Sequence, residues 1–303
     1  MTGTEPTTAE AGLRRLARPS GAFAMVATDQ RESLRTIYHD ATGALVDDDV
    51  LRAFKVSAAR VLTPLASAIL VDRDFGLEPI LAARALDSSC GLIVAADALV
   101  QEAGGPVTDS AMDSHVVPDA VRAQGAVALK LLIIWRDDDH RERRHRLAGS
   151  FIEMCRGAGL LSVVEVIVRS PVGREAGWDR EIAALEAARE IGAQGPDLYK
   201  AEVPYLGRAE PLLMEEGSRA LTEAAGRPWV VLSAGVPLEH FEAAVEAACR
   251  GGASGFLAGR AIWSDAVALE GVEANLQRIS APRLQRLGEL VDEVARPWWA
   301  PSG

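Results

Sequence analysis

The sequence predicts an α/β fold in which eight parallel strands and their helices close into a single (β/α)₈ TIM barrel. Short apolar, β-branched runs alternate with Ala-, Leu-, Glu- and Arg-rich stretches of helical spacing, a pattern typical of consecutive β-α units. The spacing is also nearly constant, since Lys130, Glu165, Lys200 and Ser233 follow one another at intervals of 35, 35 and 33 residues. One unit of such a barrel takes roughly 30 residues, so these intervals fit closure.

Eight segments are expected to form the strands. They cover residues 22–28, 68–71, 91–96, 127–135, 161–168, 197–203, 229–234 and 254–258. A doubly wound open sheet is the competing fold, but no GxGxxG follows the first strand to support it. We expect residues 1–12 to be a disordered N-terminal extension and residues 13–303 to form one barrel domain, because no linker or low-complexity segment divides the chain.

The composition excludes several classes of protein. With 49% hydrophobic and 25% charged residues the chain has ordinary globular composition. Its net charge of -11 argues against a nucleic-acid partner, which needs a basic surface. Neither an 18-residue apolar run nor a signal sequence occurs, so we expect a cytoplasmic protein without a membrane partner. Three distant cysteines, Cys90, Cys155 and Cys249, predict neither a disulfide nor a structural metal site.

Two irregular stretches, 102–118 and 170–178, follow predicted strands on the side where barrel active sites are built. They are candidate rims or lids, and plain surface loops are the alternative. Near the C-terminus, the adjacent Trp298 and Trp299 are expected to pack against the barrel base or a neighbouring subunit.

Ionisable residues inside three consecutive strands are the main functional signal. Burying an unpaired charge costs several kcal/mol, so Lys130, Glu165 and Lys200 need either compensation or a purpose. Further candidates close other strands at the same rim: Asp29, Gln30 and Arg31 after the first, Ser233 and Gly235 after the seventh, and Gly259 and Arg260 after the eighth. Each alone has a structural alternative, such as an ion pair, a helix cap or a surface arginine.

Together these residues predict Schiff-base chemistry. A lysine attacks a carbonyl only as the neutral amine, and burial and a nearby cation both favour that form. Lys200 is the candidate nucleophile, Lys130 the candidate cation, and Glu165 the candidate proton shuttle. None of the five histidines lies in a predicted strand, so no metal or other cofactor is expected. The loops that hold Ser233, Gly235, Gly259 and Arg260 lie where such barrels bind phosphate.

The sequence resembles the bacterial tagatose-bisphosphate aldolase family, and in particular its sulfofructosephosphate aldolase branch. The matching segments are FAMVATDQRESLR (23–35), FKVSAARVLTPLASAILVD (54–72), LIVAAD (92–97), ALKLLIIWR (128–136), DLYKAEVP (197–204) and GASGFLAGRAIW (252–263). The resemblance implies that Lys200 forms the Schiff base with help from Glu165 and Lys130. It also implies that Asp29 orients the substrate, and that Ser233, Gly235 and Arg260 bind phosphate.

The reaction that this branch implies is the reversible cleavage of 6-deoxy-6-sulfofructose 1-phosphate to dihydroxyacetone phosphate and sulfolactaldehyde. The resemblance also implies a small-molecule sugar phosphate substrate and a homo-oligomer. Arg31, Arg136 and Arg169 follow strand ends and are the candidates for a sulfonate pocket, with surface ion pairs as the alternative. Three rivals stay open: a tagatose or fructose bisphosphate aldolase of the same mechanism, a sugar-phosphate-sensing regulatory barrel, and a metal-dependent aldolase.

Overall fold

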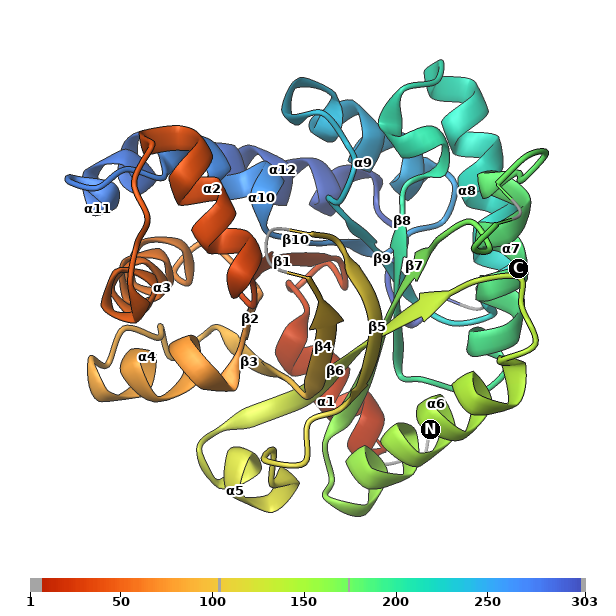
Figure 1. Ribbon diagram of the computed structural model, residues 1–303, viewed down its shortest axis with the longest axis horizontal. Helices are drawn as coiled ribbons and strands as arrows, with labels where there is room; N and C mark the ends of the chain where they lie inside the picture. The colour runs from red at the N-terminus through yellow and green to blue at the C-terminus, as the bar shows by residue number, and fades with distance from the viewer. Residues whose placement is uncertain (1–6, 103–104, 174, 301–303) are drawn as a thin grey trace, which may run out of the picture.

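The computed structural model describes residues 7–102, 105–173 and 175–300 and contains a closed parallel barrel (Figure 1). Its strands are hydrogen-bonded in the order β1-β10-β9-β8-β7-β6-β3-β2. They are β1 Phe23–Ala27, β2 Ala68–Val71, β3 Gly91–Ala95, β6 Ala126–Trp135, β7 Leu161–Val168, β8 Leu198–Glu202, β9 Trp229–Leu232 and β10 Gly255–Ala258. Each strand coincides with a predicted segment to within two residues at either end, and the predicted TIM barrel is confirmed.

Helices surround the barrel as an outer ring (Figure 1). The ring contains α2 Glu32–Thr42, α3 Asp48–Leu62, α4 Glu78–Ala82, α5 Pro118–Ala123, α6 Arg141–Gly157, α7 Arg180–Gly192, α8 Pro211–Ala225, α9 Phe241–Arg250, α10 Arg260–Trp263, α11 Val272–Asn275 and α12 Ala281–Val294, whereas α1 Thr8–Leu16 lies outside it. Shorter helical turns cover Arg73–Leu77, Pro204–Gly207, Leu238–His240, Ser264–Ala266 and Leu276–Ser280. The main apolar core lies between this ring and the outward-facing strand residues.

Helix α1 closes the amino-terminal end of the barrel. Leu13 and Leu16 are buried among inward-facing strand residues such as Met25 and Val163. Thr7 caps the helix, because its hydroxyl accepts a hydrogen bond from the Glu10 backbone N–H. The expectation of a disordered extension over 1–12 is therefore wrong for residues 7–12, whose apolar helix face the composition of the segment did not reveal. Residues 1–6 lie outside the described residues.

An antiparallel hairpin, β4 Asp97–Gln101 and β5 Val107–Met112, follows β3 directly. Leu99 and Val107 pack against an apolar layer at the opposite end of the barrel interior from α1, formed by Leu132, Ile134, Ile167 and Leu232. The Ser110 hydroxyl also donates a hydrogen bond to the Leu132 carbonyl. Residues 102–118, expected to be irregular, thus contain a strand, and the hairpin lies over the carboxyl-terminal end of the barrel.

The C-terminal tryptophans divide between two environments. Trp298 is buried in the same base cluster as α1, which confirms that part of the expectation, whereas Trp299 is about half exposed. The guanidinium of Arg14 lies 5.6 Å from the ring centroid of each tryptophan. All three cysteines are buried and free.

Candidate active site

Lys130, Glu165 and Lys200 lie on the neighbouring strands β6, β7 and β8 and face the barrel interior. Their exposed fractions are only 3%, 8% and 4%. The parallel register pairs Glu165 with Lys200, while Lys130 pairs with Val163, two residues before Glu165. Side chains of alternate residues point to the same face, so the strands place these three groups together at mid-depth.

The Lys130 ammonium group contacts three carboxylates at once. Its Nζ lies 3.1 Å from Asp29 Oδ2, 2.9 Å from Asp97 Oδ2 and 2.8 Å from Glu165 Oε2. Burial opposes the charge, but these carboxylates outweigh it and raise the pKa of Lys130 well above its usual value. An ammonium group has three protons to donate, so Lys130 is a fixed cation whose donors are all in use.

One oxygen of Glu165 joins the two lysines. Oε2 lies 2.9 Å from Lys200 Nζ as well as 2.8 Å from Lys130 Nζ. Burial raises the pKa of Glu165, yet Lys130 and then Lys200 outweigh that effect and hold it below its usual value. An ionised carboxylate in contact with the candidate nucleophile is placed to accept a proton from it and to return one.

Asp97 belongs to this network, although sequence reasoning did not single it out. The residue is fully buried at the start of β4, and its Oδ2 also accepts a hydrogen bond of 3.1 Å from the Leu132 N–H. Ile93 and Ala95 of β3 face the interior, so continued alternation points Asp97 inward as well. An acidic residue two positions beyond an inward-facing strand residue was the available signal.

The guanidinium of Arg31 already has hydrogen-bond and ion-pair partners within the protein. Its guanidinium donates to the Asp97 carbonyl at 3.0 Å and to Asp97 Oδ1 at 3.2 Å, and Asp74 lies 3.8 Å away. Gln30 instead keeps a buried side-chain oxygen, Oε1, without a hydrogen-bond partner among the described residues. Of the two, Gln30 has the free acceptor, while the role of Arg31 in substrate binding remains a prediction.

The four residues of the predicted phosphate site follow the adjacent strands β9 and β10. Ser233 and Gly259 are buried, whereas Gly235 and Arg260 are exposed. A Cβ atom on Gly259 would lie 2.6 Å from the Ala27 carbonyl oxygen and 2.8 Å from Gln30 Nε2, so this position requires glycine. Among the described residues, no hydrogen bond or ion pair joins these four residues to Lys200.

A strained turn follows the strand of Lys200. Tyr205 and Leu206 have φ of 56° and 52°, a left-handed conformation that costs non-glycine residues roughly 1–2 kcal/mol each. Leu206 Cδ2 lies 2.9 Å from the position that a Cβ on Gly235 would take, and Gly235 itself has φ of 79°. The turn therefore packs directly against the candidate phosphate loop, and position 235 of that loop requires glycine.

All three lysines of the sequence are buried in this region. Lys55 of α3 pairs with Asp72 and donates to the Thr28 and Gln30 carbonyls at 2.6 and 2.7 Å. These two carbonyls flank Asp29, so Lys55 fixes the loop that carries it. Sequence reasoning missed this role, because Lys55 lies in a helix, where a surface position is the ordinary expectation.

Neither a metal site nor a membrane segment is evident in the ranges that the structure describes. No group of three or more His, Cys, Asp or Glu residues in these ranges could hold a metal ion. No helix there is long and apolar enough to cross a membrane.

Comparison with known proteins shows the family of the chain. Residues 23–265 match the model of the DeoC/LacD family aldolases. A tagatose 1,6-diphosphate aldolase of Listeria monocytogenes is 28% identical, with 96% of this chain and 94% of the relative covered. Fructose-bisphosphate aldolase of Plasmodium falciparum has a similar fold, with a TM-score of 0.68 and 12% identity over 97% of this chain and 98% of that one.

An archaeal fructose-1,6-bisphosphate aldolase is similar in fold as well. That structure has its catalytic lysine bound covalently to the carbinolamine intermediate of the substrate. The TM-score is 0.63 at 19% identity, and the match covers 94% of this chain and all of the other. The family match spans most of the sequence and includes Asp29, Lys130, Glu165 and Lys200. The chain therefore belongs to the DeoC/LacD family of aldolases.

Proposed function

We propose that this chain is a class I aldolase in which Lys200 forms the Schiff base with a ketose 1-phosphate. The observation that carries the proposal is the contact of 2.9 Å between the buried Lys200 amine and Glu165 Oε2, beside the fixed cation Lys130. Glu165 takes a proton from the Lys200 ammonium group, and the free amine attacks the C2 carbonyl to give a carbinolamine. Glu165 then returns the proton to the departing hydroxyl, and loss of water leaves the iminium.

The iminium makes carbon-carbon cleavage possible without a metal. As the C4 hydroxyl loses its proton to the ionised Glu165, the C3–C4 bond breaks, an aldehyde leaves, and the bonding electrons form an enamine on Lys200. Glu165 returns this proton to the enamine at C3, and hydrolysis of the resulting iminium releases dihydroxyacetone phosphate and restores the amine. Lys130 touches Glu165 and Asp29 throughout, and it stabilises their ionised forms.

The proposed substrate is 6-deoxy-6-sulfofructose 1-phosphate, with sulfolactaldehyde as the released aldehyde. Support comes from the segments that resemble the sulfofructosephosphate aldolase branch. Tagatose and fructose bisphosphates are the second candidates, favoured by the name of the Listeria relative. A sensing barrel without turnover is another alternative, and burial of three linked ionisable groups, a costly arrangement, argues for catalysis instead.

Cleavage assays separate these possibilities. Purified enzyme is mixed with the sulfonated ketose phosphate or with either bisphosphate, and dihydroxyacetone phosphate is measured by coupled reduction. We expect higher kcat/KM on the sulfonated substrate and no cleavage by Lys200→Met, which is close to lysine in length. Higher kcat/KM on a bisphosphate would reject the proposed substrate but retain the mechanism. Undiminished cleavage by Lys200→Met would reject the nucleophile, and a wild-type protein that binds ketose phosphates without cleaving any would support the sensing barrel.

A further inference from the structure

Two arginines continue the inward-facing rows of the catalytic strands. On β6, Lys130 and Ile134 face the interior, and Arg136 comes two residues after Ile134. On β7, Glu165 and Ile167 face the interior, and Arg169 comes two residues after Ile167. The backbone N–H of Arg169 donates a hydrogen bond to the Trp135 carbonyl at 2.9 Å, so the hydrogen bonding between the two strands extends to Arg169. By alternation both arginines face the mouth of the barrel, above the apolar layer that contains Ile134 and Ile167.

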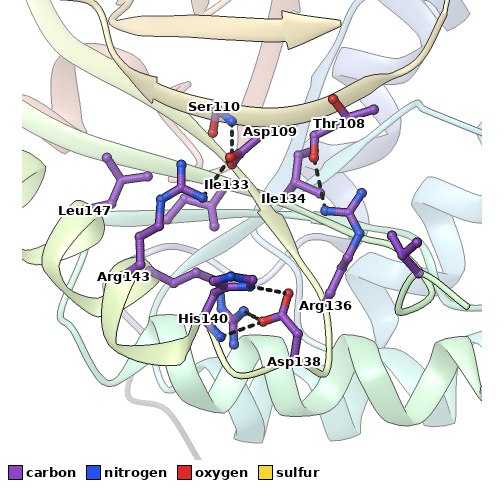
Figure 2. Close-up of a pocket in the computed structure, with 12 residues that line it drawn as sticks. Thr108, Asp109, Ser110, Ile133, Ile134, Arg136, Asp138, His140, Arg143 and Leu147 are labelled. Atoms are coloured by element: carbon purple, nitrogen blue, oxygen red, sulfur yellow. Dashed lines mark hydrogen bonds and ion pairs between the residues drawn. The ribbon is translucent and has the colours of Figure 1, made fainter. Parts of the chain in front are cut away.

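These two half-buried guanidinium groups have carbonyl contacts but no carboxylate within ion-pair distance among the described residues. Arg169 donates to the Val168 carbonyl at 3.1 Å, and Arg136 donates to the Thr108 carbonyl at 3.0 Å (Figure 2). Nε of Arg136 is buried and has no partner in the part of the chain that the structure describes. A half-buried cation without an ion pair of its own is incompletely compensated, so an anion from outside the chain would complete the arrangement.

Nearby arginines behave differently because each already has an acidic partner. Arg31 is held by Asp97, as described above. Arg143, on the far side of the pocket that Arg136 borders, lies 2.7 Å from Asp109 (Figure 2). Arg180 of α7 lies 2.8 Å from Glu202. Lack of an acidic partner therefore separates Arg136 and Arg169 from these three neighbours.

The charges around Arg169 are mostly of its own sign. Burial lowers its pKa, Glu202 opposes that effect, and Arg180, Arg136 and Arg260 add to it. Glu202 has the largest effect of the four charged side chains, but its ion pair is with Arg180, and three arginines surround Arg169. Arg260 belongs to the candidate phosphate loop after β10, and two strands, β8 and β9, separate β10 from β7, the strand that precedes Arg169. A ligand with an anionic group at both ends suits this arrangement.

We propose that Arg169, with Arg136 beside it, forms the subsite for the terminal tetrahedral oxyanion of the aldehyde half of the substrate. The inference rests on the proposed function and deepens it, because it assigns the second charged end of the ketose. Arg169 lies four residues beyond Glu165, about 13 Å along the strand. The guanidinium side chain, directed inward, and the carbons beyond the scissile bond would span this distance. Both sulfonate and phosphate offer the oxygens that a guanidinium fork binds.

The test uses the synthetic direction, with dihydroxyacetone phosphate and three aldehydes. Sulfolactaldehyde carries a sulfonate, glyceraldehyde 3-phosphate carries a phosphate, and glyceraldehyde carries neither. For Arg169→Gln we expect the ratio of kcat/KM on a charged aldehyde to kcat/KM on glyceraldehyde to fall about ten- to a hundredfold, as for loss of charge-assisted hydrogen bonds. Arg143→Gln removes the same charge from a paired neighbour and is expected to leave the ratio unchanged.

Two outcomes would overturn the subsite: an equal loss on all three aldehydes, or an unchanged ratio in Arg169→Gln. Arg169→Lys keeps the positive charge but lacks the two-pronged guanidinium, and it replaces the glutamine variant if that variant does not fold. A smaller loss of kcat/KM that is confined to the charged aldehydes would support the subsite. No such loss would reject it. The wild-type preference between sulfolactaldehyde and glyceraldehyde 3-phosphate separates sulfonate from phosphate. Failure of the proposed function is recognised separately, because wild-type enzyme would then form no reducible adduct with dihydroxyacetone phosphate.

Discussion

Replacing Lys130 by methionine removes the cation that the carboxylates of Asp29, Asp97 and Glu165 share. Methionine keeps the unbranched shape, so the main change is electrostatic. Glu165 retains Lys200 at 2.9 Å and Asp97 retains Arg31 at 3.2 Å, but Asp29 loses its one ion-pair partner among the described residues. We expect Asp29 to take up a proton in the folded variant, because burial of an unpaired carboxylate favours its neutral form.

The upper limit of this effect is the cost of leaving a buried charge unpaired, about 3–5 kcal/mol, because Lys200 and Arg31 still lower the pKa of Asp29. At about 1.4 kcal/mol per pH unit, this limit corresponds to a rise in the pKa of Asp29 from about 4 in the unfolded chain to about 6–7.5 in the folded variant. Over that interval the folded state binds more protons than the unfolded state. The free energy of unfolding therefore falls as pH rises, by about 1.4 kcal/mol per unit, and is level above the folded pKa.

The wild-type protein is expected to behave in the opposite way. Burial raises the pKa of Asp29, but Lys130 and then Lys200 outweigh it, so the pKa lies below its usual value. This stabilisation is complete above about pH 4 and is lost only as pH falls further. Between pH 5 and 8, the contribution of this group to wild-type stability is constant.

Urea unfolding at pH 5, 6, 7 and 8, followed by circular dichroism, measures the difference. We expect Lys130→Met to become less stable relative to wild type as pH rises from 5 to about 6–7.5. Adding Asp29→Asn to Lys130→Met should remove the slope, because the group that takes up the proton is then absent. A stability difference that is independent of pH, or one that decreases as pH rises, would refute the assignment of Lys130 as the counter-charge of Asp29.

Three further changes test other parts of the site. Glu165→Gln removes the proton shuttle and should lower kcat for cleavage by roughly 10²- to 10⁴-fold, measured by steady-state kinetics; a loss below tenfold would exclude that role. Asp97→Asn should lower the free energy of unfolding by about 1.5–3 kcal/mol in urea, since a charged hydrogen-bond acceptor is lost, and unchanged stability would count against its contact with Lys130. Gly259→Ala should raise KM and cost about 1–3 kcal/mol by calorimetry, because its Cβ would lie 2.6 Å from the Ala27 carbonyl oxygen; wild-type values would argue against the close approach.

The fold was predictable because each barrel strand has an apolar run and the runs recur at regular intervals. The missed elements lack that signal. Strand β4 follows β3 after a single residue, Ala96, so both sit within one continuous stretch. Its partner β5, VTDSAM, is mostly polar or small and is stabilised by pairing across the mouth rather than by burial on both faces. Helix α1 was missed because it buries only two leucines, Leu13 and Leu16.

The candidate site was predictable where a charge interrupts a strand. Lys130, Glu165 and Lys200 stood out for that reason, and the structure brings them into contact. Asp97 comes after its strand, and Lys55 reaches the site from helix α3, so neither interrupts an apolar run. Arg31 was expected beside the substrate, but in the folded chain its guanidinium donates a hydrogen bond to Asp97. Which side chains contact one another across the barrel depends on how the strands close into a barrel, and local sequence patterns do not specify this.

The central claim, that Lys200 is the Schiff-base nucleophile, is tested most directly by borohydride trapping with dihydroxyacetone phosphate. The chain has only Lys55, Lys130 and Lys200, so peptide mass spectrometry assigns a reduced lysine adduct with little ambiguity. We expect one adduct, on Lys200, and none in Lys200→Met. No adduct in the wild-type protein, or one on Lys55 or Lys130, would contradict the account.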